Sequence, residues 1–380
     1  MATASGYEQS ETMDWTNTDH GDANAIPGAT LTAEDPLAGI KELARQVRSG
    51  GITEVQGNVA FDDRLFTANF EPQPTPVMIN DNLIDIVTTP TDATVKTVAV
   101  GQPTAITIVG SAPGAITVTG TIAAGSATLV RVAPISDPAA FARTAFIEAL
   151  RAAGVQIDAV AIGENPKKLL PPSSTYPDSS RVAAYVSPPY SEYAKLILKV
   201  SHNLGANLGL CLLAVHAKSA DGNAGFALLK DFLTAAKVDV AQLAMSYAEG
   251  GPADRATLQT FAQILRYWTK QKDFDAFRAC LPILGTDGSL SSVAVDSLAR
   301  GKVFAKTGTN VGFDPLGQRL LVQSKALAGF FQRVDGQWQV FNVVVNDAGG
   351  APDISAVLSA NEDVGEVATQ LWKEANPAGR

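Results

Sequence analysis

The sequence predicts an α+β fold in which an all-β module is inserted into a larger domain of helices and antiparallel strands. Residues 57–135 are rich in Thr, Val, Ile, Gly and Pro, carry little charge, and contain short runs of alternating apolar and polar residues. Such alternation is typical of strands with one buried face. Helical spacing dominates residues 136–268, and two later apolar runs flank Asp335-Gly336, a β-hairpin signal. Helices that back an antiparallel sheet form an α+β domain.

These patterns divide the chain into three parts. Residues 1–56 are a lead-in followed by a helix of the larger domain, residues 57–135 are the β-rich module, and residues 136–380 are the remainder of the larger domain. The lead-in, to about residue 30, is polar and rich in Gly, Asp and Asn, which predicts a loop.

The first helix is predicted to begin at Asp35, because aspartate is a good N-cap and Pro36 suits a first helical turn. A strand is expected at residues 55–61. The adjacent Asp62 and Asp63 fit either a turn cap or a metal or acid/base pair. No other type of metal ligand is near them in the sequence, so we favour the turn cap.

Within the module, alternating runs predict strands at residues 105–109 and 115–119, separated by turn residues. Beyond the module, apolar residues recur at helical spacing. The predicted helices run from Asp137 to Gly154, from Ser187 to Ser201, from Asn203 to Val215, over 225–237 and over 256–268.

The carboxyl-terminal part predicts strands and one last helix. Strands are expected at 303–305, 326–331 and 338–345, and Val364, Val367 and Leu371 form the apolar stripe of the helix.

Composition excludes several classes of function. The 380 residues suffice for two or three domains, and the net charge of -9 with pI ≈ 4.9 argues against nucleic-acid binding. No run of eighteen apolar residues predicts a transmembrane segment. The three histidines are scattered, so we expect no metal site and no cofactor. Cys211 and Cys280 are interpreted as two buried thiols, with a disulfide as the alternative.

The stretch 301–309 carries the most chemistry. It reads as a strand that ends in a cation, two hydroxyls and a glycine, namely Lys306, Thr307, Gly308 and Thr309. The hydroxyls are suited to bind a carboxylate, the lysine supplies charge or a base, and a glycine lets another backbone approach. By itself the stretch also fits an ordinary edge strand with an exposed lysine.

A second motif, Ser201-His202-Asn203, lies between two predicted helices about a hundred residues earlier. Ser-x-Asn followed by a Lys-Thr-Gly strand is part of the signature of penicillin-recognising serine hydrolases. Further family-like runs are 78–85, 186–189, 199–203, 281–290 and 305–309. From about Thr18 onward the sequence resembles the D-alanyl-D-alanine carboxypeptidase/endopeptidase family of low-molecular-mass penicillin-binding proteins.

The resemblance implies a penicillin-binding-protein-like or β-lactamase-like domain with an inserted β module and a three-stranded remnant of a larger sheet. It also implies catalytic roles for Ser201 in proton relay, Asn203 in binding a substrate amide, and Lys306 in the proton network. Thr307, Gly308 and Thr309 would bind substrate. The implied ligands are peptidoglycan stem peptides, β-lactams or small esters, met in the periplasm or outside the cell. The sequence as given predicts no signal peptide.

One departure from the family concerns the nucleophile, which the family carries in Ser-x-x-Lys. No lysine in this sequence has a serine three residues before it, so the chain resembles a truncated member that lacks the amino-terminal segment. We therefore expect impaired hydrolysis, with Ser201 as a substitute nucleophile and Lys306 as its base. The alternative is a non-catalytic binding or scaffold protein. From the residues alone, Ser201 also fits a helix N-cap and Asn203 a loop amide.

The same absence predicts self-association. Without the missing segment, the strand at 303–305 would present an unpaired edge, and the apolar helix at 208–215 would be exposed. We expect a homodimer or a larger homo-oligomer.

Overall fold

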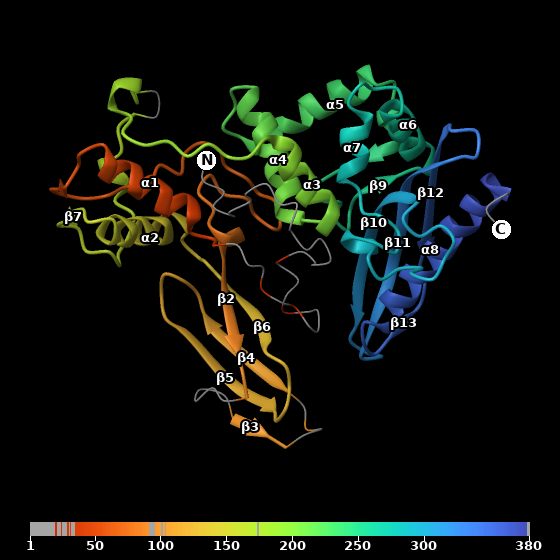
Figure 1. Cartoon of the computed structure of the whole chain (residues 1–380), viewed down its shortest axis with the longest axis horizontal. Helices are drawn as coiled ribbons and strands as arrows, with labels where there is room; N and C mark the ends of the chain where they lie inside the picture. Colours follow the sequence, from red (N-terminus) through yellow and green to blue (C-terminus); the bar gives the residue numbers. More distant parts are fainter. Residues whose placement is uncertain are drawn as a thin grey trace.

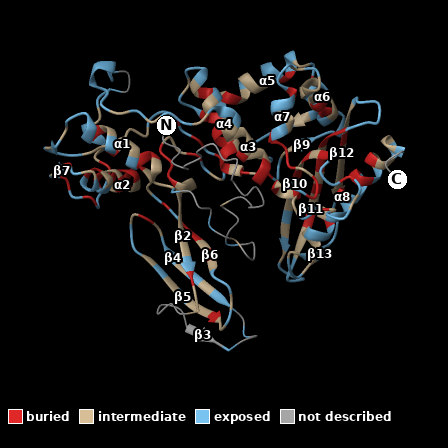
Figure 2. Ribbon diagram, in the orientation of Figure 1, coloured by how far each residue is buried: buried red, intermediate tan, exposed pale blue. Residues whose placement is uncertain are grey.

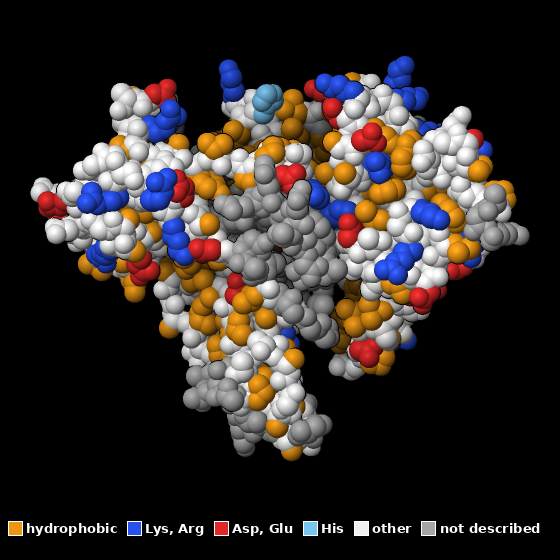
Figure 3. Space-filling view, in the orientation of Figure 1, with side chains coloured by type: hydrophobic (Ala, Val, Ile, Leu, Met, Phe, Trp, Pro, Cys, Tyr) orange, Lys and Arg blue, Asp and Glu red, His pale blue; other side chains and the backbone are white. Residues whose placement is uncertain are grey.

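The computed structural model describes residues 20, 24, 29, 31, 35–90, 96–99, 102, 104–172 and 175–377. The predicted loop before residue 30 lies largely outside them. Figure 1 shows a pair of helices at one end, a β module that projects away, and a helical region that leads to a sheet. On the face drawn in Figure 3, positive and negative side chains are interspersed over the helical and sheet regions.

The helices of the described residues are α1 (Ala38–Ser49), α2 (Pro138–Ala152), α3 (Tyr190–Val200), α4 (Asn203–His216), α5 (Gly225–Ala235), α6 (Leu258–Trp268), α7 (Phe274–Cys280) and α8 (Ser355–Ala375). The strands are β1 (Glu54–Val55), β2 (Leu83–Thr88), β3 (Lys96–Val98), β4 (Ala105–Gly110), β5 (Ile116–Ala123), β6 (Leu129–Pro134), β7 (Gln156–Ile157), β8 (Leu243–Ala244), β9 (Arg255–Ala256), β10 (Val303–Asp314), β11 (Arg319–Gln332), β12 (Trp338–Asn346) and β13 (Gly350–Ala351). Short 3-10 turns include η2 (Asn80–Asn82) and η7 (Gly288–Leu290).

The amino-terminal helix pair differs in detail from the prediction. Helix α1 begins at Ala38, about one turn after the expected cap Asp35, because the Asp35 carboxylate accepts a hydrogen bond from Leu37 N in a turn that precedes the helix. The strand expected at 55–61 is wrong in extent, since only Glu54–Val55 pairs, with β7. The Asp62 carboxylate caps a turn by accepting from Arg64 N, as predicted.

The module consists of two small sheets. Strands β2 and β6 pair antiparallel, and β5 lies between β3 and β4 in a separate sheet. Strands β4 and β5 confirm the two strands predicted from alternation. Figure 2 shows that few module residues are buried, in contrast to α3, α4 and the sheet beyond them.

The helical region follows the predicted order. Asp137 caps α2 by accepting from Ala140 N, which confirms that prediction. The helix expected from Ser187 begins later, at Tyr190, whereas α4 begins at Asn203 as predicted. The short α7 was not predicted. Cys211 and Cys280 are free and buried, as expected.

The carboxyl-terminal sheet has four strands rather than the expected three. Its order is β10-β11-β12, and β13 pairs with Leu320 and Leu321 near the start of β11. One face packs against α8 around Val303, Ala305 and Leu327, and the other packs against α6 and α7 around Phe304 and Phe330. The turn at Asp335-Gly336 connects β11 to β12, as predicted.

Two surfaces that were expected to be open are covered. The outer edge of β10 is paired, because Leu284 N donates to Val303 O and Ala305 N donates to Pro282 O. Helix α4 is also covered, since Leu208 and Cys211 pack in one cluster with Phe66, Phe70 and Met78. The expected unpaired edge at 303–305 and the expected bare helix at 208–215 are therefore wrong. The reason is that segments 66–78 and 282–284 of the chain itself occupy these surfaces.

Candidate functional site

Ser201 lies at the junction of two helices. It is the C-cap of α3 in a left-handed conformation (φ 64°), and His202 is the N-cap of α4, so Ser201 is not the N-cap that the sequence allowed. The His202 N–H donates back to Ile197 O and closes the end of α3. Asn203 is the first residue of α4 rather than a loop residue. The tight turn thus presents Ser201 and Asn203 on either side of a buried histidine.

Lys306 connects the Lys-Thr-Gly strand to the Ser-x-Asn turn. Its Nζ donates to Ser201 Oγ at 2.6 Å and to the carbonyl oxygen of its neighbour Thr307 at 2.6 Å. Along β10, Val303 and Ala305 face α8, so Lys306 projects from the opposite face, on the side of the helical region. Two side chains that are 105 positions apart in sequence therefore form one polar pair.

The other predicted residues of β10 have separate environments. Thr307 is buried, and its hydroxyl lies 2.7 Å from Ser289 Oγ in η7. Gly308 and Thr309 are exposed. Among the described residues, a Cβ built on Gly308 would meet only the Ala326 Cβ within 4 Å, at 3.4 Å. No described residue therefore prevents another backbone from approaching Gly308.

Lys325, which no sequence motif marked, lies beside Thr309 on the neighbouring strand. It stands opposite Thr309 in the register of β10 and β11, and its Nζ donates to Thr309 Oγ1 at 2.7 Å. Lys325 is 4% exposed, and burial lowers the pKa of its ammonium to about 8.

The loop before β10 joins the two motifs. Its Asp287 carboxylate accepts a hydrogen bond at 2.6 Å from the buried ammonium of Lys199, which lies in the last turn of α3. Gly288 adopts φ +59°, and a Cβ there would lie 2.5 Å from the Lys199 carbonyl oxygen, so the position requires glycine. Ser289 then contacts Thr307. One short loop is therefore bonded to the helix that ends at Ser201 and to the strand that carries Lys306.

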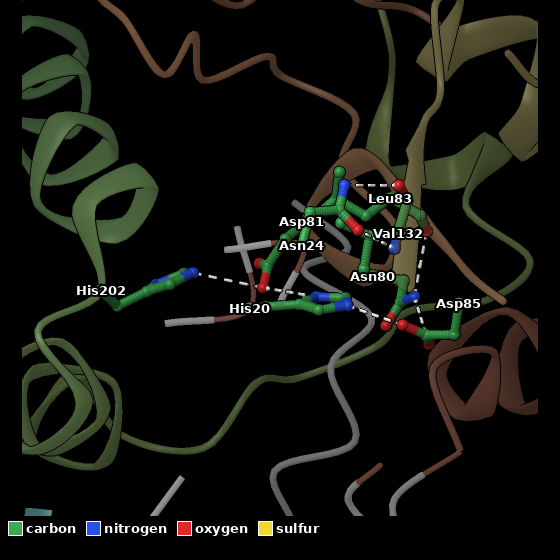
Figure 4. Close-up of polar contacts among 8 residues, drawn as sticks. All are labelled: His20, Asn24, Asn80, Asp81, Leu83, Asp85, Val132 and His202. Atoms are coloured by element: carbon green, nitrogen blue, oxygen red, sulfur yellow. Dashed lines mark hydrogen bonds and ion pairs between the residues drawn. The ribbon is translucent and has the colours of Figure 1, made fainter. Parts of the chain in front are cut away.

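A cluster of acids and histidines includes His202, the residue that follows Ser201 (Figure 4). Asp81 Oδ2 is 3.2 Å from His202 Nε2 and 3.3 Å from His20 Nδ1, and Asp85 Oδ1 is 2.7 Å from His20 Nε2. Asn80, Asp81 and Asn82 all have left-handed backbone conformations, which asparagine and aspartate adopt more readily than most residues. This strained turn directs the Asp81 carboxylate at the histidine between Ser201 and Asn203.

Charge within this cluster shifts the pKa values of its members. Burial opposes a charge on His20, but hydrogen bonds to Asp81 and Asp85, and their negative charges, outweigh burial and raise the pKa of His20 to about 9. Burial likewise opposes the Asp81 carboxylate, yet the two histidines hold its pKa well below the usual range. Asp81 is therefore an anion at neutral pH.

The described residues contain no group of three or more His, Cys, Asp or Glu side chains that could hold a metal ion. Among the same residues, no helix is long and apolar enough to cross a membrane.

Some of these residues had weak sequence signals. Asp81 and Asp287 lie inside the family-like runs 78–85 and 281–290, but neither run indicated a partner for its acid. Lys325 lies in an apolar strand, where a lone lysine is an anomaly that could have pointed to it.

Comparison with known proteins gives a consistent picture. Residues 25–363 match the D-Ala-D-Ala carboxypeptidase 3 (S13) family. A curated relative, the D-alanyl-D-alanine carboxypeptidase of Actinomadura sp. (strain R39), is 24% identical over 369 residues, which cover 84% of this chain and 64% of the relative. The chain thus spans less than two thirds of that relative's length.

Solved structures share the fold. Penicillin binding protein 4 of Haemophilus influenzae, in complex with a β-lactam, has a TM-score of 0.62 at 16% identity and covers 87% of this chain and 77% of its own. A second structure of the same protein has a TM-score of 0.62 at 15% identity, and the match covers 87% of this chain and 78% of that structure's chain. At these identities the likeness supports the α+β fold alone.

Proposed function

We propose, from the premise that this chain belongs to the D-Ala-D-Ala carboxypeptidase 3 (S13) family of low-molecular-mass penicillin-binding proteins, that it binds peptides ending in D-Ala-D-Ala. β-Lactams and small esters are further ligands of the same site. The observation that carries this proposal is the 2.6 Å contact between Lys306 Nζ and Ser201 Oγ, which unites the two motifs. Peptidoglycan stem peptides lie outside the cytoplasmic membrane, so the proposal places the ligand there.

Each site residue has a proposed role. Asn203, at the start of α4, binds a ligand amide through its side chain. Thr307 and Thr309 bind the ligand's terminal carboxylate, and the open space over Gly308 admits the ligand backbone. Ser201 and Lys306, which contact each other, would lie next to the acyl carbonyl of the ligand.

Turnover is proposed to use Ser201 as a substitute nucleophile. An unprotonated Lys306 would take the Ser201 proton as Oγ attacks the acyl carbon, and would return it to the departing D-alanine amine. Water would then hydrolyse the acyl-serine ester. Loss of the dedicated nucleophile of a serine hydrolase costs on the order of a millionfold in turnover, so we propose weak hydrolysis.

One observation favours non-catalytic binding as the second candidate. Lys306 Nζ donates to both Ser201 Oγ and Thr307 O, and both contacts suit a protonated ammonium. A lysine held as a donor must lose a proton before it acts as a base, and its unperturbed pKa is about 10.4. In this case the site would hold a ligand without cleaving it.

Hydrolysis of a p-nitrophenyl ester separates the two candidates. If Ser201 is the nucleophile, Ser201→Ala and Lys306→Ala abolish the rate above background, while the controls Ser191→Ala and Lys230→Ala keep it. Equal rates in all variants contradict turnover at this site. Calorimetry with N-acetyl-D-Ala-D-Ala then tests whether the site still binds.

We also propose that the chain forms a homo-oligomer. The end of the β10–β11 hairpin exposes Val311, Phe313 and Leu316, at 39%, 58% and 96%. Exposed apolar residues on a sheet edge favour association. Sedimentation of Phe313→Lys and of the unchanged chain tests this: a monomer in both contradicts it.

A further inference from the structure

The sheet contains a buried lysine beside an exposed threonine of the neighbouring strand. Lys325 is 4% exposed and lies in the middle of β11, whereas its cross-strand neighbour Thr309 is exposed on β10. The ammonium donates to Thr309 Oγ1 at 2.7 Å. The positive charge thus lies within the sheet, one hydrogen bond from an exposed residue of β10.

This lysine has no carboxylate counter-ion among the described residues. None of the ion pairs within that part of the chain includes Lys325. Lys199, which is also buried, has Asp287 at 2.6 Å. A buried charge without a partner is unfavourable for folding, so a lysine retained in that state suggests that an anion completes the pair.

The hydrogen bond also fixes how Thr309 is used. An ammonium can only donate, so Thr309 Oγ1 accepts from Lys325 and its own O–H remains to donate elsewhere. A hydroxyl polarised by a cation is a stronger donor toward an anion. Lys306 donates to Ser201 Oγ instead, so the two lysines have different hydroxyl partners.

We propose that Lys325 recognises the terminal carboxylate of a peptide ligand by acting through the Thr309 hydroxyl. Lys325 is a positioning residue, since its ammonium touches Thr309 and not the ligand. The inference rests on the proposed function, because it names the cation that makes the site selective for a free carboxyl end. A ligand whose carboxylate is replaced by an amide loses this interaction.

The test is calorimetric binding of N-acetyl-D-Ala-D-Ala and of its carboxyl-terminal amide to the full chain. The unchanged chain should prefer the acid. Lys325→Met, which keeps the apolar stem, should weaken binding of the acid roughly tenfold to a hundredfold and leave binding of the amide within about twofold. Thr309→Val should act in the same way, whereas Thr309→Ser, which keeps the hydroxyl, should keep the preference for the acid. The exposed control Lys230→Met should change the binding of neither ligand.

Thermal unfolding distinguishes recognition from structural support. Removal of an unpaired buried charge should leave the melting temperature of Lys325→Met equal or higher. The inference is overturned, with the proposed function intact, if Lys325→Met keeps the preference for the acid. It is also overturned if the variant loses both ligands together with thermal stability. If the unchanged chain binds neither ligand, the proposed function fails and this inference fails with it.

Discussion

The Lys199 ammonium lies 2.6 Å from the Asp287 carboxylate, and this ion pair attaches the loop before β10 to the end of the helix that leads to Ser201. Lys199 is 2% exposed. Burial lowers the pKa of Lys199 in spite of the attraction of Asp287. Because the same loop also bonds to Thr307 through Ser289, the pair helps to fix the distance between the two motifs.

Removal of the acid from this pair should be costly. Asp287→Asn leaves the Lys199 ammonium buried without a counter-ion, and we expect a loss of about 3 kcal/mol in the free energy of unfolding. The control is Asp35→Asn, because the Asp35–Lys41 pair is exposed and should contribute less than about 1 kcal/mol. Denaturant titration measures both, and equal effects would contradict the role given to Asp287.

A glycine beside His202 should resist substitution. A Cβ on Gly205 would lie 2.6 Å from His202 Nδ1 and 2.8 Å from Ile197 Cγ1, so Gly205→Ala must displace the histidine or the helix. We expect destabilisation of about 1–3 kcal/mol. Gly209→Ala is the matched control in the same helix. Among the described residues its Cβ would meet nothing closer than the Tyr190 hydroxyl at 3.5 Å, so we expect a gain of up to about 1 kcal/mol. A gain for both variants would show that His202 is not held where we describe it.

The cluster of His20, Asp81, Asp85 and His202 should make stability depend on pH. The folded pKa of His20 is raised from 6.5 to about 9, so its contribution is fully present below pH 6.5 and is lost as pH rises through 9. The groups that face it are Asp81 and Asp85, and His202 shares Asp81. We expect His20→Gln to cost roughly 2 kcal/mol at pH 6 and little at pH 10.

The free energy of unfolding of the unchanged chain and of His20→Gln, measured at pH 6 and at pH 10, checks this prediction. The exposed His216→Gln is the control and should show no such difference. A penalty for His20→Gln that is the same at pH 6 and pH 10 would exclude a charged His20 as the cause.

The periodicity of the sequence was enough to predict much of the fold. The alternation at 105–109 and 115–119 and the cap at Asp137 depend on local backbone preferences, and the structure has these elements. The contacts that cover β10 and α4 could not be predicted in this way. They pair residues far apart in sequence, such as Phe66 with Leu208, and local patterns carry no information about such pairs.

The candidate site could likewise be predicted only in part from the sequence. Ser201, Asn203 and Lys306 were identified by motif, and the side chains of Ser201 and Lys306 are in contact. Lys325 and Asp287 were missed, because their importance depends on burial and on partners from other elements. A single charged residue in an apolar strand is a weak signal until its depth is known.

The central claim is that Ser201 and Lys306 form one reactive site, and covalent labelling tests it most directly. The chain is incubated with a fluorescent penicillin, denatured, and digested for mass spectrometry. We predict an adduct on the peptide that contains Ser201, absent in Ser201→Ala and strongly reduced in Lys306→Ala, and retained in Ser191→Ala. No adduct at saturating penicillin, or an adduct on a residue outside this site, would contradict the claim.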